Sequence, residues 1–238
     1  MGARDRPNTG VTTSGGRPRW PGADLPGRRI FVAVPLPPEA RDAVARLVDE
    51  IREAGVPGGG RDVRWVRLDG LHLTLRFIGP TPDERIGPAV DAVRGAAAST
   101  ARFDAVIGGA GVFPAHGRPR ALWLGLREGA ETLTDLAEAV DTALADAGWA
   151  FDRKPFTAHL TLARSDGVAA AGAIGAHLVA AAAELEIPFR VERMGVFESL
   201  TGGGPARYEP LDMVELGYHP QDAGAVPGPR RSGGSDRP

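Results

Sequence analysis

The 238-residue chain contains no cysteine and a single lysine, Lys154. Without cysteine there are no disulfides, thiol nucleophiles or cysteine-bearing zinc sites, and the composition fits the reducing environment of the cytoplasm. Arginine therefore carries nearly all of the positive charge. Because the chain is also rich in alanine and has 33 Gly and 21 Pro, we attribute the arginine excess to codon composition and not to RNA binding.

Strong net charge and long apolar runs are missing as well. The 28 Lys and Arg residues nearly balance the 30 Asp and Glu residues, so no global positive field indicates a nucleic-acid-binding protein. No segment approaches the roughly 18 consecutive apolar residues of a transmembrane helix, and the N-terminal segment lacks the apolar stretch of a signal peptide. We therefore expect a cytoplasmic protein that does not contact a membrane.

The two ends of the chain differ in composition from its middle. Residues 1–27 and 218–238 are rich in glycine, proline and arginine and contain few apolar residues, which is typical of disordered segments. We expect one folded domain over residues 28–217, built from two lobes, with a disordered tail on each side.

Within this domain, helical and extended spacings of apolar residues alternate. The expected helices cover residues 37–55, 82–98, 129–148 and 168–183. The expected strands cover residues 29–36, 103–113, 120–126, 156–164, 187–200 and 208–217, with two further extended stretches in 63–79 that are separated by the turn Asp69-Gly70. Each half thus carries a helix, a strand with the letters HLTL, a second helix and further strands. This weak internal repeat predicts two similar lobes.

The tetrapeptide HLTL occurs at His72–Leu75 and again at His159–Leu162. Because the chain has only five histidines, chance does not explain two identical stretches 87 residues apart. Alternate side chains of a strand share a face, which places His72 beside Thr74 and Arg76, and His159 beside Thr161. The opposite faces carry the residues expected in the core: Leu71, Leu73, Leu75 and Phe77 in the first copy, and Phe156, Leu160 and Leu162 in the second.

If the two lobes pack about a pseudo-two-fold axis, two imidazoles and two hydroxyls converge in one cleft. Histidine titrates near neutrality, so one imidazole of a pair can act as base while the other acts as acid. Threonine hydroxyls can donate hydrogen bonds to the non-bridging oxygens of a phosphate and stabilise its transition state. The set therefore fits in-line hydrolysis of a phosphodiester without a metal or cofactor.

Three other interpretations of the motifs remain open. The histidines can be structural, although structure alone does not ask for histidine at both equivalent places. They can bind a metal, although His-x-Thr brings no carboxylate ligand at a useful spacing. They can activate a Ser or Thr nucleophile, although the chain has no nucleophile-elbow motif.

The chain resembles the two-histidine (2H) phosphoesterase superfamily, which is defined by paired His-x-Thr motifs. Within it the chain is most similar to the RNA 2′,3′-cyclic phosphodiesterases, formerly called 2′-5′ RNA ligases. The similar segments are RIFVAVPLPPEARDAV, RWVRLDGLHLTLRFIG, FPAHGRPRALWLGL, FTAHLTLAR and FESLTGGGPARYEPL, in this order. The resemblance implies a bilobal α+β fold in which antiparallel sheets line a central cleft and helices lie outside. It also implies hydrolysis of a 2′,3′-cyclic phosphate at an RNA 3′ end to a 2′-phosphomonoester.

The resemblance also implies roles for single residues. His72 corresponds to the acid that protonates the departing 3′ oxygen and His159 to the base that activates water. Thr74, Thr161 and Arg164 correspond to phosphate-binding groups, and Tyr208 falls on the C-terminal tyrosine of the family. Where the family often has proline before the second histidine, this chain has Ala158, a change that removes no functional group.

Two further residues are candidates for substrate contact. Arg76 shares the face of His72, and His116 lies in the loop PAHGRP, which is placed to overhang the cleft. Trp65 and Trp123 are expected in the core. We expect a monomer that takes RNA 3′ ends or cyclic nucleotides as substrate and uses no metal or cofactor.

Alternative functions are 2′-5′ RNA ligation, hydrolysis of a small cyclic nucleotide such as ADP-ribose cyclic phosphate, and non-catalytic binding of RNA ends. A module that only binds RNA ends would not need two proton-transfer groups.

Overall fold

The computed structural model of the chain describes residues 27–55, 63–152, 154–200, 202 and 206–217. The helices in this part are α1 (Pro38–Glu53), α2 (Asp83–Ser99), α3 (Ala130–Asp146) and α4 (Ala169–Ala181), with a 3-10 turn at Leu68–Gly70. The strands are β1 (Arg28–Pro35), β2 (Val63–Trp65), β3 (His72–Thr81), β4 (Phe103–Phe113), β5 (Ala121–Glu128), β6 (Leu160–Ser165), β7 (Ile187–Val191), β8 (Arg193–Leu200) and β9 (Arg207–Glu215). The tails predicted to be disordered lie almost entirely outside the described residues, so that expectation and the domain limits stay predictions.

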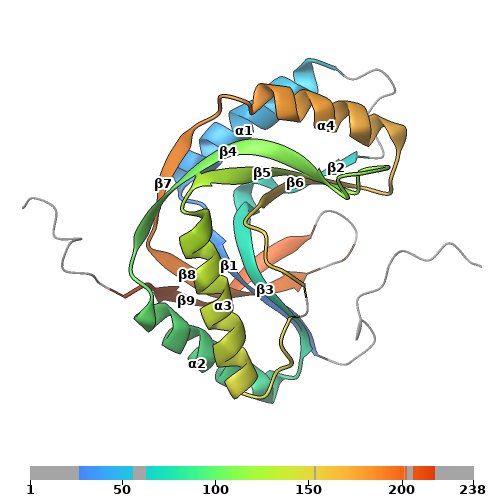
Figure 1. Ribbon diagram of the computed structural model, residues 1–238. Helices are drawn as coiled ribbons and strands as arrows, with labels where there is room; N and C mark the ends of the chain where they lie inside the picture. Colours follow the sequence, from blue (N-terminus) through green and yellow to red (C-terminus); the bar gives the residue numbers. More distant parts are fainter. Residues whose placement is uncertain (1–26, 56–62, 153, 201, 203–205, 218–238) are drawn as a thin grey trace, which may run out of the picture.

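The strands form two antiparallel sheets. One sheet has the order β3-β1-β8-β9, and the other has the order β2-β6-β5-β4-β7. Helices α2 and α3 pack together beside the first sheet, whereas α1 and α4 cover the second (Figure 1). Each sheet and its helices form one lobe, so the predicted bilobal α+β fold is confirmed. No helix in the described residues is long and apolar enough to cross a membrane.

The two lobes do not each correspond to one half of the sequence. Helix α1 follows β1 of the four-stranded sheet but packs against α4 and β7 of the other lobe. Helix α3 follows β5 of the five-stranded sheet but packs against α2 and β3. Each lobe therefore contains segments from both halves, and this exchange ties the lobes together.

Apolar spacing explains why the helices pack where they do. Five residues of α1 are buried, and they recur at the spacing that places them on one helical face: Ala40, Val44, Leu47, Val48 and Ile51. Pro38 stands in the first turn of this helix, where its missing N–H costs no hydrogen bond. The central strand β1 is buried along most of its length, from Ile30 to Val34.

Two expected strands differ from the structure. Residues 187–200 were expected as one strand, but the chain leaves one sheet after β7 and enters the other at β8, with Glu192 between them. The strand expected at 156–164 begins only at Leu160. Pro155 precedes this stretch, and proline cannot donate a backbone hydrogen bond to a neighbouring strand. His159 therefore lies directly before β6 and not inside it.

Candidate active site

The histidines of the two HLTL motifs hold their rings in the same way. His72, at the start of β3, donates a hydrogen bond from Nδ1 to the carbonyl of Gly70 at 2.7 Å. His159 donates one from Nδ1 to the carbonyl of Thr157, also at 2.7 Å. Because a carbonyl oxygen can only accept, each ring carries a proton on Nδ1. In both rings Nε2 is therefore the nitrogen that is left for a substrate.

Aromatic rings surround His72. Its ring centroid lies 5.0 Å from that of Phe31 and 4.8 Å from that of Tyr208, which meets it edge-on at 84°. Tyr208 approaches closely because Gly70 has no side chain: a Cβ there would lie 3.3 Å from Cδ2 of Tyr208. Burial lowers the pKa of His72 below its ordinary value, and the positive charges of Arg164 and His159 lower it further.

His159 has a similar aromatic environment on the other lobe. Its ring lies 5.2 Å from Phe113 at 90° and 6.3 Å from Trp123. Trp123 packs on the backbone of Gly111, where a Cβ would lie 2.3 Å from Cζ2 of the indole. Burial lowers the pKa of His159, with a smaller contribution from Arg164. Both imidazoles are therefore held neutral in the ligand-free protein at neutral pH.

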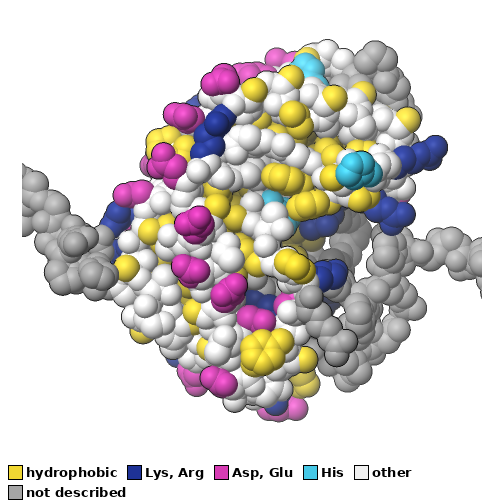
Figure 2. All heavy atoms as spheres, viewed as in Figure 1, with side chains coloured by type: hydrophobic (Ala, Val, Ile, Leu, Met, Phe, Trp, Pro, Cys, Tyr) yellow, Lys and Arg dark blue, Asp and Glu magenta, His cyan; other side chains and the backbone are white. Residues whose placement is uncertain are grey.

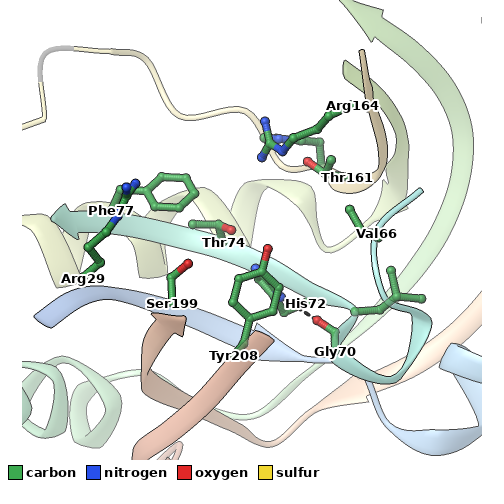
Figure 3. Close-up of a pocket in the computed structure, with 12 residues that line it drawn as sticks. Arg29, Val66, Gly70, His72, Thr74, Phe77, Thr161, Arg164, Ser199 and Tyr208 are labelled. Atoms are coloured by element: carbon green, nitrogen blue, oxygen red, sulfur yellow. Dashed lines mark hydrogen bonds between the residues drawn. The ribbon is translucent and has the colours of Figure 1, made fainter. Parts of the chain in front are cut away.

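Both histidines border one cavity of about 430 Å³ between the lobes, which we call the histidine cavity (Figure 3). Figure 2 shows dark blue basic side chains at the hollow between the lobes. The lining residues are Arg29, Val66, Gly70, Leu71, His72, Thr74, Phe77, His159, Thr161, Arg164, Ser199 and Tyr208. The cavity thus brings together both predicted histidines, both predicted threonines, Arg164 and Tyr208. Burial raises the pKa of the Tyr208 hydroxyl, so this group stays protonated.

A β-bulge lies at the last residue of each HLTL motif and determines which later residues face the cavity. In β3, Thr74 pairs with Ala33 and Arg76 with Val32, which leaves Leu75 as an extra residue. In β6, Thr161 pairs with Trp123 and Ala163 with Leu122, which leaves Leu162 as the extra residue. An extra residue reverses the alternation of faces beyond it.

The two bulges have equivalent consequences. The fifth residue after each histidine, Phe77 in β3 and Arg164 in β6, faces the histidine cavity. The fourth residue, Arg76 or Ala163, faces away from it; Ala163 is fully buried. The expectation that Phe77 lies in the core is therefore wrong, because its side chain is 43% exposed.

Arg76 does not line the histidine cavity. Its Nε lies 2.7 Å from Oδ1 of Asp141 in α3, and its Nη1 lies 3.2 Å from Oδ2 of Asp152. It borders a neighbouring cavity of about 410 Å³, which shares Thr74, Phe77 and His159 with the first. Arg76 therefore joins β3 to α3, and its predicted contact with the substrate stays a prediction. His116 lies exposed in the loop after β4 and borders neither of these cavities.

Sequence reasoning missed Arg29, Ser199 and Phe77 as cavity residues. Arg29 and Phe31 alternate along β1, and the contact of Phe31 with His72 marks that face of the strand as the cavity face. Arg29 was visible in the sequence as a basic residue of the expected strand 29–36. Its place at the cavity, however, depends on the contact between Phe31 and His72, which are far apart in the sequence. In the described part of the chain, no group of three or more His, Cys, Asp or Glu is arranged to hold a metal ion.

The family model of the 2′-5′ RNA ligase superfamily matches residues 33–203, which include both HLTL motifs. This chain belongs to that superfamily. A protein from Geobacillus stearothermophilus named RNA 2′,3′-cyclic phosphodiesterase is 35% identical over 135 residues, which cover 56% of this chain and 41% of that protein. One of the same name from Methanothermobacter thermautotrophicus is 33% identical over 139 residues, which cover 58% of this chain and 72% of that protein.

A solved structure agrees with this assignment to the 2′-5′ RNA ligase superfamily. The crystal structure of E. coli LigT complexed with 3′-AMP is similar with a TM-score of 0.61 and 25% identity, and covers 79% of this chain and 98% of that one. The chain spans less than half the length of the Geobacillus relative. The resemblance predicted from the paired motifs is thus confirmed for the family, while the role of each residue stays a prediction.

Proposed function

We propose that this member of the 2′-5′ RNA ligase superfamily hydrolyses RNA 2′,3′-cyclic phosphate ends to 2′-phosphomonoesters. The proposal rests on one observation. Two imidazoles border the same cavity, each donates a hydrogen bond from Nδ1 to a backbone carbonyl, and each therefore has Nε2 left for the substrate. The names of the relatives from Geobacillus and Methanothermobacter support the reaction, and the LigT complex with 3′-AMP supports a nucleotide ligand.

The reaction requires one group that accepts a proton from the attacking water and another group that donates a proton to the leaving oxygen. The two groups must lie on opposite sides of the phosphorus. Nε2 of His159 accepts a proton from water as the water oxygen attacks phosphorus, and the bond between phosphorus and the 3′ oxygen breaks. Nε2 of His72 gives its proton to that oxygen, which leaves a 3′ hydroxyl and a phosphate on the 2′ oxygen. The product pair, His159 protonated and His72 neutral, returns to the starting state by proton exchange with solvent.

The remaining cavity residues stabilise the charge on phosphorus. Thr74 and Thr161 stand two residues after the histidines and line the same cavity, so their hydroxyls reach the non-bridging oxygens. Arg164 supplies positive charge at the same place, and this charge also lowers the pKa of both histidines. Tyr208 positions the His72 ring through their edge-on contact.

Phe77 supplies a surface for the nucleoside. Its exposed ring lies in the cavity beyond Thr74, and an aromatic face stacks on any base without regard to sequence (Figure 3). The proposed contact therefore predicts little preference for the identity of the terminal base.

The test is incubation with an oligonucleotide that ends in a 2′,3′-cyclic phosphate, followed by analysis of its ends. We expect a 2′-phosphate to form, also in EDTA, because the proposed steps use only imidazole, hydroxyl and guanidinium groups. A 3′-phosphate product, joining of two RNA ends, or binding without turnover would each contradict the proposal. Loss of activity in EDTA that a divalent ion restores would contradict the mechanism.

A further inference from the structure

The histidine cavity contains one cation that the proposed reaction does not use. Many arginines of the described residues form ion pairs with carboxylates, among them Arg28, Arg64, Arg67, Arg94, Arg102 and Arg190. Among the described residues, no hydrogen bond or ion pair to a carboxylate is found for the two arginines of the cavity, Arg29 and Arg164. Arg164 serves the reacting phosphate, so the role of Arg29 is open.

Arg29 is held at one end of the cavity by the geometry of β1. It shares a strand face with Phe31, which stacks on Phe197 of β8 with centroids 5.5 Å apart and also contacts His72. Strands β1 and β8 are antiparallel, and Ile30 pairs with Glu198. The next residue of β8, Ser199, therefore lies opposite Arg29. Figure 3 shows Arg29 beside Phe77, with Thr74 and Ser199 between it and His72.

A half-buried guanidinium that has no carboxylate partner among the described residues, next to a hydroxyl, suits an anion with several oxygens, above all a phosphate. The cavity therefore offers two places for phosphate: one among His72, Thr74, Thr161 and Arg164, and a second at Arg29. An RNA 3′ end that bears a cyclic phosphate has two phosphates on its last nucleotide. The reacting phosphate bridges the 2′ and 3′ oxygens, and the other lies on the 5′ oxygen of the same ribose.

We propose that Arg29, assisted by the Ser199 hydroxyl, binds the phosphate on the 5′ side of the terminal nucleotide while Phe77 supports its nucleoside. The proposal rests on the proposed function of the same cavity. It makes Arg29 a specificity residue that favours RNA ends over nucleoside 2′,3′-cyclic phosphates, which lack that phosphate.

Three substrates with the same terminal base distinguish a contact to the 5′ phosphate from contacts to the reacting phosphate or to the preceding nucleoside. They are a nucleoside 2′,3′-cyclic phosphate, its 5′-phosphorylated form, and a dinucleotide with the same cyclic end. We expect the wild-type protein to show a higher kcat/KM for the two substrates with a 5′ phosphate. Arg29→Gln should lower kcat/KM for those two by about 10- to 100-fold more than for the nucleoside, the range expected for one charge-assisted hydrogen bond. Arg29→Lys, which keeps the charge, should retain part of the preference.

The matched control is Arg193→Gln, which removes one positive charge from an exposed position on the same sheet, outside the cavity. It should leave the ratio between the substrates unchanged. Melting temperatures of all variants show whether a loss of activity reflects folding.

Several outcomes would overturn the inference. An equal loss on all three substrates would place Arg29 at the reacting phosphate or in the scaffold. A loss on the dinucleotide alone would assign the contact to the preceding nucleoside. If the wild-type protein hydrolyses none of the three, the proposed function fails. The Arg29 claim is then decided by the Kd values of the same compounds, which should weaken in Arg29→Gln only where a 5′ phosphate is present.

Discussion

The two catalytic candidates are chemically alike but not equally placed. Both imidazoles donate a hydrogen bond from Nδ1 to a backbone carbonyl, yet His72 is packed against both Phe31 and Tyr208, and a positive charge on His159 lowers its pKa. A proposed acid in such a place is neutral until an anion arrives. Under the proposed mechanism, the negative charge of the substrate therefore favours protonation of His72 before the reaction.

This relation predicts proton uptake on ligand binding. In the free protein the pKa of both His72 and His159 lies below the ordinary value of about 6.5, so both rings are neutral at pH 7. A bound phosphate anion favours the charged form and raises these pKa values. Titration calorimetry with a nucleoside 2′-phosphate at pH 7 in buffers of different ionisation enthalpy should show uptake of protons. His72→Ala should take up fewer protons, whereas His177→Ala, an exposed histidine on α4, should behave like the wild type. Proton release would contradict the account.

The two threonines allow an isosteric test. Thr74→Val or Thr161→Val keeps the shape of the strand and removes only the hydroxyl donor. Loss of a donor to the charged transition state should lower kcat by about 10²-fold, in the range found for single oxyanion-hole donors. Thr142→Val, at an exposed position on α3, is the matched control and should leave kcat unchanged. A Thr74 or Thr161 variant with wild-type kcat would remove that hydroxyl from the mechanism.

At the scale of the strand, the sequence predicted which residues of the motif face the cavity, but not which residues after the motif do so. Period-two alternation placed His72 with Thr74 and His159 with Thr161 correctly, because no bulge lies between the members of either pair. It failed at Arg76 and Phe77, because Leu75 is an extra residue opposite β1. The bulge depends on the partner strand, which is distant in the sequence, so local periodicity contains no sign of it.

The same bulge predicts a structural role for Arg76. The side chains of Arg76 and Asp141 are only 11% and 19% exposed, so removing one partner leaves a poorly solvated charge. Arg76→Gln should lower the free energy of unfolding by about 1–3 kcal/mol with little change in KM. Denaturant unfolding and steady-state kinetics measure the two effects. Asp141→Asn should lower the free energy of unfolding by a similar amount. The double variant should lose less free energy than the two single variants added together. A large rise in KM for Arg76→Gln at unchanged stability would instead place Arg76 at the substrate.

At the scale of the whole molecule, local patterns located the elements but not their partners. The expected helices agree with α1 to α4 within two residues at every end, since apolar spacing, prolines and glycines mark these ends. The exchange of α1 and α3 between lobes, and the passage of the chain between sheets at Glu192, depend on long-range packing. A strand pattern does not reveal which sheet the strand joins.

Truncation tests the domain limits predicted from composition. A chain of residues 28–217 should keep the melting temperature and the kcat of the full chain on a small cyclic-phosphate substrate, because the removed segments have too few apolar residues to join the core. On long RNA it should bind somewhat more weakly at low salt, since both segments contain arginine. A large drop in melting temperature would show that one of the segments belongs to the fold.

The central claim is that His159 takes a proton from water while His72 gives one to the 3′ oxygen. A substrate in which sulfur replaces the bridging 3′ oxygen tests it most directly, because a thiolate leaves without protonation. On the normal substrate, His72→Ala and His159→Ala should each lower kcat by about 10²- to 10⁴-fold. On the sulfur substrate, His72→Ala should regain most of the wild-type rate and His159→Ala should not. If the sulfur substrate restores the rate of His159→Ala alone, His159 is the acid and His72 is the base. Equal behaviour of the two variants on both substrates would contradict a division of labour between the histidines.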